Sequence, residues 1–122
     1  MKIIIVVPEV KYKLIKHLDD IMAIIKEYSQ NNEECKITFL LEKAFAKRFN
    51  NICVLGDFNN WSLGLNNFTE NEDSFSTSIH VLSNNSYHFR YLANGVNWFN
   101  ESEADDEVDG YYEGSKNSVI IV

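Results

Sequence analysis

The chain contains little of what would mark a disordered, membrane-spanning or disulfide-stabilised protein. Its 122 residues include one proline, five glycines and two cysteines. Apolar residues make up 45% of the sequence, an ordinary share for a globular protein, so disorder is not expected. No apolar stretch approaches the roughly 20 residues of a membrane span. The length predicts one domain that is large enough to bury a hydrophobic core.

Positive charge is also scarce. Eleven Lys and Arg face 18 Asp and Glu, which gives a formal net charge of −7. This balance argues against nucleic acid and against an anionic membrane surface as partners, because both are bound through Lys and Arg. The apolar run after Met1 is too short for a signal peptide and ends at Pro8 and Glu9 without a cleavage site. We therefore expect a cytoplasmic protein.

The Cys and His residues do not suggest a metal site or a cofactor. Cys35 and Cys53 have no CxxC spacing, and two such residues cannot form a zinc site by themselves. A disulfide would be unusual in a reducing compartment. The histidines His17, His80 and His88 share no common spacing, so surface roles are expected. We expect no metal and no cofactor.

Residues 1–34 differ in character from the rest and are predicted to form an N-terminal extension. A short strand is expected over residues 2–7. Five apolar residues then recur at spacings of four, three, four and three: Leu14, Leu18, Ile21, Ile25 and Tyr28. This spacing predicts one face of a helix over residues 10–29, with charged residues on its other side. The polar run 30–34 is predicted to end the helix as a linker.

Residues 35–122 show the period-2 alternation of β-strands. We expect strands over residues 36–42, 52–58, 74–81, 87–92, 96–99 and 118–122. Asn94-Gly95 is a strong two-residue hairpin signal, because a type I′ turn needs positive φ at both positions. The predicted fold class is mainly β: an antiparallel β-sandwich with an N-terminal α-helical extension.

The most informative motif is Val54-Leu55-Gly56-Asp57-Phe58-Asn59-Asn60-Trp61. It indicates a buried strand that ends at a polar corner, because Asn tolerates turn geometry. A Trp at such a corner is either a core plug or an aromatic plate offered to a ligand. The residues alone leave both open and favour the plug.

From residue 36 to the end, the chain resembles a family 48 carbohydrate-binding module. Four motifs carry the resemblance in order: KITFLL with VLGDFNNW, YHFRY, NGVNW and GSKNSVIIV. Such modules are early-set, immunoglobulin-like sandwiches. They precede the barrel of glycogen branching and debranching enzymes and form the glycogen-binding domain of the AMP-activated protein kinase β-subunit. Small stand-alone bacterial proteins of this kind are the most similar.

The resemblance implies a shallow surface site for α-1,4-linked glucose, made by Trp61, Trp98, Arg90 and Asn117. The indole faces would stack on the C–H face of a pyranose ring, and the two polar side chains would bond its hydroxyls. Such a site is expected to be weak, because each stack covers little surface. Further candidates are Asn60, Tyr111 and Tyr112.

Less specific roles remain open for the same residues. The resemblance also implies a structural role for Trp61, because the module often docks on the barrel of the family's enzymes and then holds no sugar. Arg90 would equally pair with a nearby carboxylate, and Asn117 would equally bond the backbone at the start of the last strand. These alternatives can be told apart only by where the side chains lie.

Catalysis is not expected. Glycosidases hold two carboxylates in a deep cleft, and the related enzymes carry theirs on a barrel of about 250 residues. The acidic run 101–109 partly resembles an EF-hand calcium loop, but Lys116 stands where a bidentate Glu is required. A solvated loop is therefore predicted for this run.

Three functions are compatible with the sequence. The first is non-catalytic binding of an α-glucan such as glycogen or starch. The second is a protein-interaction module, with the sheet face or the N-terminal helix docking a glycogen-metabolising enzyme or a second copy of the chain. The third is a detached fragment that acts only beside a catalytic subunit.

Overall fold

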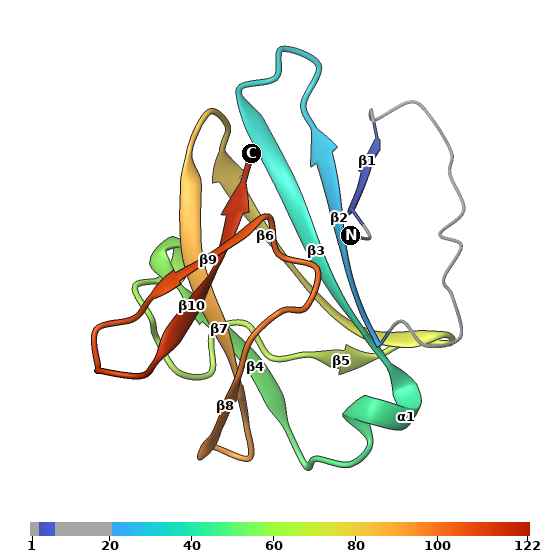
Figure 1. Cartoon of the computed structure of the whole chain (residues 1–122). Coiled ribbons are helices and arrows are strands. Elements are labelled where there is room, and N and C mark those ends of the chain that lie inside the picture. The colour runs from blue at the N-terminus through green and yellow to red at the C-terminus, as the bar shows by residue number, and fades with distance from the viewer. Residues whose placement is uncertain (1–2, 7–20) are drawn as a thin grey trace.

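The structure is a computed structural model that describes residues 3–6 and 21–122. Within these residues the chain forms two five-stranded sheets (Figure 1). Buried apolar residues from both sheets form one core between them, so the molecule is a mainly β sandwich. No helix in this part of the chain is long and apolar enough to cross a membrane.

The first sheet contains the N-terminal strands. In spatial order it consists of β1 (Ile3–Val6), β2 (Met22–Tyr28), β3 (Glu34–Glu42), β6 (Ser74–Leu82) and β5 (Thr69–Glu70). β1 is parallel to β2, and the other neighbouring pairs are antiparallel. β1 confirms the short strand expected over residues 2–7. A helical turn, α1 (Lys43–Ala46), follows β3.

Strand β2 shows that the predicted helix is wrong in its described part. Residues 22–28 pair with residues 35–41 of β3 in antiparallel register. The spacing fitted a helix face, but Ile24 and Ile25 are both buried, and neighbouring buried β-branched residues are typical of a strand covered on both faces. Residues 10–20 of the expected helix lie outside the described residues. Of the run 30–34, expected as a linker, residues 30–33 belong to the turn between β2 and β3, and Glu34 begins β3.

The second sheet carries the strands that position the candidate site. In spatial order it consists of β4 (Ile52–Gly56), β7 (Ser86–Ala93), β10 (Lys116–Ile121) and β9 (Asp106–Asp109), and β8 (Asn97–Phe99) also pairs with β7. β4 and β7 pair from Ile52–Ala93 to Gly56–Phe89. On its other side, β7 pairs with β10 near its start and with β8 near its end.

Two local predictions for this sheet need correction, and one is confirmed. The strand expected over residues 52–58 ends at Gly56, because residues 57–59 form a 3₁₀ turn, η1 (Asp57–Asn59). The acidic run expected as a solvated loop contains β9, which pairs with β10. Asn94 and Gly95 have φ values of 54° and 72°, which confirms the hairpin turn with positive φ at both positions.

Alternation along the strands of the second sheet separates an inner from an outer face. Phe89 and Tyr91 point into the core, where both are fully buried, and Phe99 packs on Tyr91 with ring centroids 5.1 Å apart. Because successive strand residues point to opposite faces, Arg90 and Trp98 lie on the outer face. The core aromatics thus fix the direction of the outer side chains.

A buried phenol and a buried carboxylate hold the segment after β8. The Tyr91 hydroxyl donates to Glu101 Oε1 at 2.6 Å. The backbone N–H of Glu101 donates to the Ser118 hydroxyl at 2.9 Å. Burial, and then the negative charge of Glu101, raise the pKa of Tyr91 well above its usual value, so the phenol stays a donor. The expectation of a solvated acidic run is therefore wrong at Glu101, which is 5% exposed.

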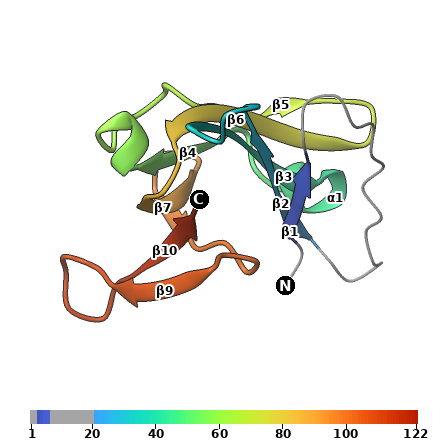
Figure 2. The same cartoon turned by 90° about the horizontal axis from the view of Figure 1, so that it is seen from above.

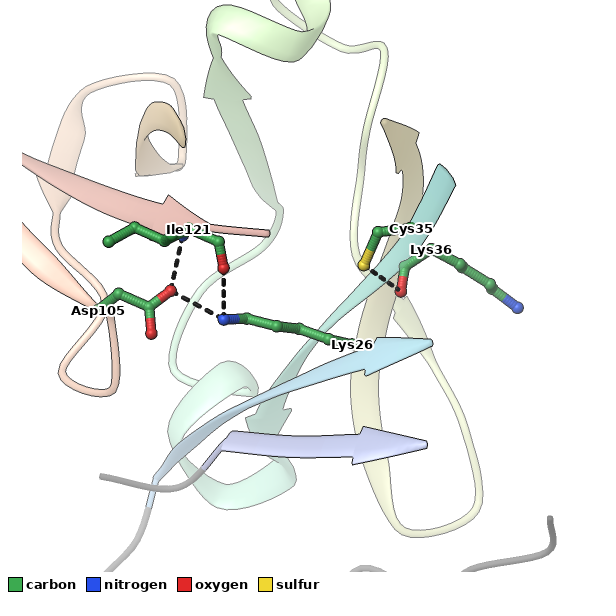
Figure 3. A network of polar contacts seen from close by, with 5 residues as sticks. All are labelled: Lys26, Cys35, Lys36, Asp105 and Ile121. Carbon is green, nitrogen blue, oxygen red and sulfur yellow. Dashed lines mark hydrogen bonds and ion pairs between the residues drawn. The ribbon is translucent and has the colours of Figure 1, made fainter. Parts of the chain in front are cut away.

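A buried lysine joins the two sheets (Figure 3). Lys26 of β2 donates to Asp105 Oδ2 at 2.9 Å and to the Ile121 carbonyl of β10 at 2.6 Å. The Ile121 N–H donates to the same Asp105 oxygen at 2.7 Å. Lys26 was expected on the polar side of a helix and Asp105 in a solvated loop, and both expectations are wrong.

The two cysteines are free thiols, and both are buried. Cys35 lies in the core, and its Sγ is 3.8 Å from the Lys36 carbonyl oxygen (Figure 3). Burial raises the pKa of the Cys35 thiol, so it behaves as a small apolar side chain. Cys53 lies on the outer side of β4, in a second apolar cluster.

Candidate binding groove

A groove of about 500 Å³ lies on the outer face of the second sheet. Nine side chains line it: Asp57, Trp61, His88, Arg90, Trp98, Tyr111, Tyr112, Ser115 and Asn117. They come from η1 and the loop after it, from β7, β8 and β10, and from the β9–β10 hairpin. Figure 2 shows the green turn after β4 and the red hairpin between β9 and β10 projecting on the same side of the sandwich.

The floor of the groove follows from strand alternation and register. His88 and Arg90 are two residues apart on β7, so they share its outer face. Leu92 is the next outward residue and pairs directly with Trp98 of β8. Trp98 is 45% exposed. The Trp98 side chain points outward because its neighbour Phe99, on the opposite face of the short β8 strand, is packed into the core.

Trp61 packs on other apolar side chains and also lines the groove. It is half-buried and packs on the small outer cluster of Cys53, Leu55 and Leu92, and it also borders the groove. Its φ is 54°, and that of Asn60 before it is also 54°. Two successive left-handed residues other than glycine are sparsely populated geometry that persists only where neighbouring contacts enforce it.

Hydrogen bonds of the Asn59 side chain and of the backbone within the turn supply these contacts. Asn59 Oδ1 accepts from the Gly56 N–H at 3.0 Å, and its amide donates to the Val54 carbonyl at 3.0 Å. The backbone N–H of Trp61 donates to the Gly56 carbonyl at 2.9 Å. Gly56 itself has no room for a side chain, because a Cβ would lie 2.6 Å from the His88 carbonyl oxygen. The turn after β4 is therefore a closely fitted unit that fixes the Trp61 backbone.

Asp57 fixes the indole ring. Its Oδ1 accepts from Trp61 Nε1 at 3.0 Å, and its Oδ2 accepts from the backbone N–H of His88 at 2.7 Å. The carboxylate thus ties the Trp61 ring edge to strand β7. The indole N–H is engaged, and what Trp61 presents to the groove is its apolar surface.

Asp57→Ala is expected to loosen Trp61 while the sandwich stays folded. The free energy of unfolding should fall by about 1 kcal/mol, because two donors lose their acceptor at an exposed site. Proton exchange at the Trp61 indole N–H, followed by NMR, should become faster, and the Trp98 indole N–H serves as the internal control. Unchanged exchange at Trp61 would show that Asp57 does not position the ring.

Arg90 is a cation without a protein counter-charge in the described part of the chain. Its guanidinium carbon lies 5.0 Å from the centroid of the Trp98 ring, a cation–π distance. Its Nε is buried and has no hydrogen-bond partner among the described residues. The ion pairs found there involve other residues. The expected alternative of a carboxylate partner for Arg90 is thus not what the described structure shows.

The remaining predicted residues lie at the β10 side of the groove. Asn117 is on β10, and no hydrogen bond of its side chain is found within residues 3–6 and 21–122. Tyr111 and Tyr112 are exposed on the β9–β10 hairpin. Asn60 is exposed at the end of η1 and does not line the groove. The structure therefore brings together every predicted candidate except Asn60.

Sequence reasoning missed three residues that line the groove: Asp57, His88 and Ser115. His88 was detectable, because it alternates with Arg90 on the same strand. Asp57 was assigned to the strand, and its contact with His88, 31 residues further along the chain, has no local signal. Ser115 is placed by the hairpin, where its N–H and hydroxyl both donate to the Tyr112 carbonyl.

The groove contains one carboxylate, that of Asp57, among the described residues that line it. Within the described part of the chain, no group of three or more His, Cys, Asp or Glu side chains is arranged to hold a metal ion. What the groove offers is aromatic surface, one cation, and neutral donors and acceptors.

No known protein family matches the chain. No curated protein shows significant similarity to it either.

Proposed function

We propose that the protein is a non-catalytic module that binds α-1,4-linked glucan in the groove. The observation that carries the proposal is that six predicted side chains line one surface depression: Trp61, Arg90, Trp98, Tyr111, Tyr112 and Asn117. The residues come from three parts of the chain: the turn after β4, the β7–β8 hairpin and the β9–β10 hairpin. The finer assignment, an immunoglobulin-like early-set fold of the carbohydrate-binding type, is part of this proposal and rests on the four motifs.

The chemistry of the groove suits a neutral sugar. The apolar face of a pyranose ring can lie on Trp98 or Trp61, and its hydroxyls can bond the Arg90 guanidinium and the Asn117 amide. Arg90 forms no ion pair with a described carboxylate, so its guanidinium can donate to a ligand in a protein with a net charge of −7. Each stack would cover on the order of 50–100 Å² of apolar surface, about 1–3 kcal/mol. Binding should therefore be weak, in the micromolar to millimolar range.

The same geometry supports binding rather than hydrolysis. A glycosidase needs two carboxylates on either side of the scissile bond, one of them free to donate a proton. In the groove, both oxygens of Asp57 accept hydrogen bonds from Trp61 and His88. The carboxylate thus acts as a structural acceptor.

The alternative of a protein-docking module has less support. It rested mainly on the apolar face of the N-terminal helix, and residues 22–28 of that helix form β2 instead. A detached module that works beside a catalytic subunit remains compatible with glucan binding, because the groove would then bring its partner to the polymer.

Affinity electrophoresis tests the proposal. The acidic wild-type protein is run in native gels that contain glycogen, amylopectin or hydroxyethylcellulose, beside an acidic protein that binds none of them. Glycogen and amylopectin should retard the wild type in proportion to their concentration, and the β-linked polymer should not. Unchanged mobility at high glycogen concentration would overturn the proposal.

A further inference from the structure

The hairpin between β9 and β10 exposes two aromatic rings. Tyr111 is 93% exposed and Tyr112 is 74% exposed. Their rings pack edge to face with centroids 5.1 Å apart. Tyrosines usually bury most of their ring, so two adjacent exposed rings beside a groove indicate a surface kept for a ligand.

The hairpin is held in shape before any ligand arrives. The Gly110 N–H donates to the Ser115 carbonyl at 2.9 Å, and the Ser115 N–H donates to the Tyr112 carbonyl at 3.0 Å. A Cβ on Gly110 would lie 2.3 Å from Ser115 Oγ, so any larger residue here would have to displace the Ser115 side chain. Lys116 and Asp109 form an ion pair at the base of the hairpin. The hairpin backbone is therefore restrained before a ligand arrives, which lowers the entropy cost of binding.

Trp61 and the two tyrosines reach the groove from opposite edges of the second sheet. Trp61 follows β4, at one edge of the sheet order β4-β7-β10-β9, and the hairpin connects the two strands at the other edge. Neighbouring strands are about 4.8 Å apart, so the sheet is about 14 Å wide from β4 to β9. Arg90 on β7 and Asn117 on β10 lie between these edges. This span is longer than one hexose ring.

We infer that Tyr111 and Tyr112 form an additional subsite, so that the groove binds several consecutive glucose residues of an α-1,4-glucan. The inference rests on the proposed function and extends it from a sugar class to a chain length. A short oligosaccharide stacks on the tryptophans, and a longer one also reaches the tyrosines. Affinity should therefore rise with the length of the glucan chain, because only a longer chain contacts Tyr111 and Tyr112.

The test is a calorimetric titration with maltose, maltotriose, maltopentaose and maltoheptaose. Wild-type affinity should rise about tenfold or more from maltotriose to maltoheptaose, the gain expected from one added stack. The double variant Tyr111→Ala/Tyr112→Ala should bind maltotriose like the wild type and lose this gain. Leu82→Ala, which removes an exposed apolar side chain from the other sheet, should keep it.

Each other outcome counts against the inference in a distinct way. If the double variant keeps the full gain with chain length, the tyrosines are no subsite, and the proposed function stands. If it weakens all four oligosaccharides equally, the tyrosines act on the central ring and the length assignment fails. If the wild type binds none of the four, the inference and the proposed function fail together.

Discussion

Trp98→Ala is expected to weaken glycogen binding by about tenfold to a hundredfold without unfolding the protein. The substitution removes one stacking platform, about 1–3 kcal/mol of the binding free energy. Trp98 is 45% exposed, and the core contacts of β8 are made by Phe99 on its opposite face. The loss should therefore appear in affinity and leave the urea midpoint nearly unchanged.

Trp61→Ala should weaken binding to a similar degree and destabilise the fold as well. Its ring covers the apolar cluster of Cys53, Leu55 and Leu92, which the substitution would open to water. Trp98→Ala should thus lower affinity alone, whereas Trp61→Ala should lower both affinity and stability. Affinity electrophoresis and urea denaturation of both, beside Leu82→Ala, measure the two quantities. Wild-type affinity in Trp98→Ala would contradict the assigned site.

Lys26→Met is expected to lower the free energy of unfolding by about 3 kcal/mol. The lysine side chain is 6% exposed and its partner Asp105 is 15% exposed, so the substitution leaves a largely buried carboxylate without its cation. Breaking a buried pair from one side is among the most destabilising changes. The Ile121 carbonyl also loses a donor at 2.6 Å. The substitution therefore removes the side chain that links β2 of the first sheet to β10 of the second.

Lys47→Met provides the matched control. Lys47 pairs with Glu70 at 3.3 Å, but their side chains are 60% and 47% exposed. Exposed pairs contribute about 1 kcal/mol or less. Urea denaturation should show a large loss for Lys26→Met and a small one for Lys47→Met. Equal, small losses would show that the Lys26 bridge does not hold the sheets together.

Lys26 also shows where sequence reasoning reached its limit in the fold. Residues 21–28 have apolar spacing that fits a helix, and Lys26 falls on its polar side. The structure pairs them with β3 and gives Lys26 partners 79 and 95 residues away. Such long-range pairing overrides local pattern, and no local signal announces it. β9 escaped prediction for a related reason: its residues Asp106–Asp109 show no apolar alternation.

The candidate site was more predictable because its determinants are local. Alternation along residues 86–93 put Arg90 on the face opposite Phe89 and Tyr91, and the Asn94-Gly95 turn fixed how β8 folds back. The order of motifs then suggested which side chains meet. Alternation could not predict the hydrogen bonds of Asp57 to Trp61 and His88. They depend on how the chain turns after Gly56.

The two tryptophans of the chain both border the groove, so intrinsic fluorescence reports on this site alone. Titration of the wild type with maltoheptaose, excited at the indole band, tests the central claim most directly. The emission should change saturably, with a midpoint in the micromolar to millimolar range, and cellohexaose should produce no such change. Emission that stays constant up to high millimolar maltoheptaose would contradict glucan binding in the groove.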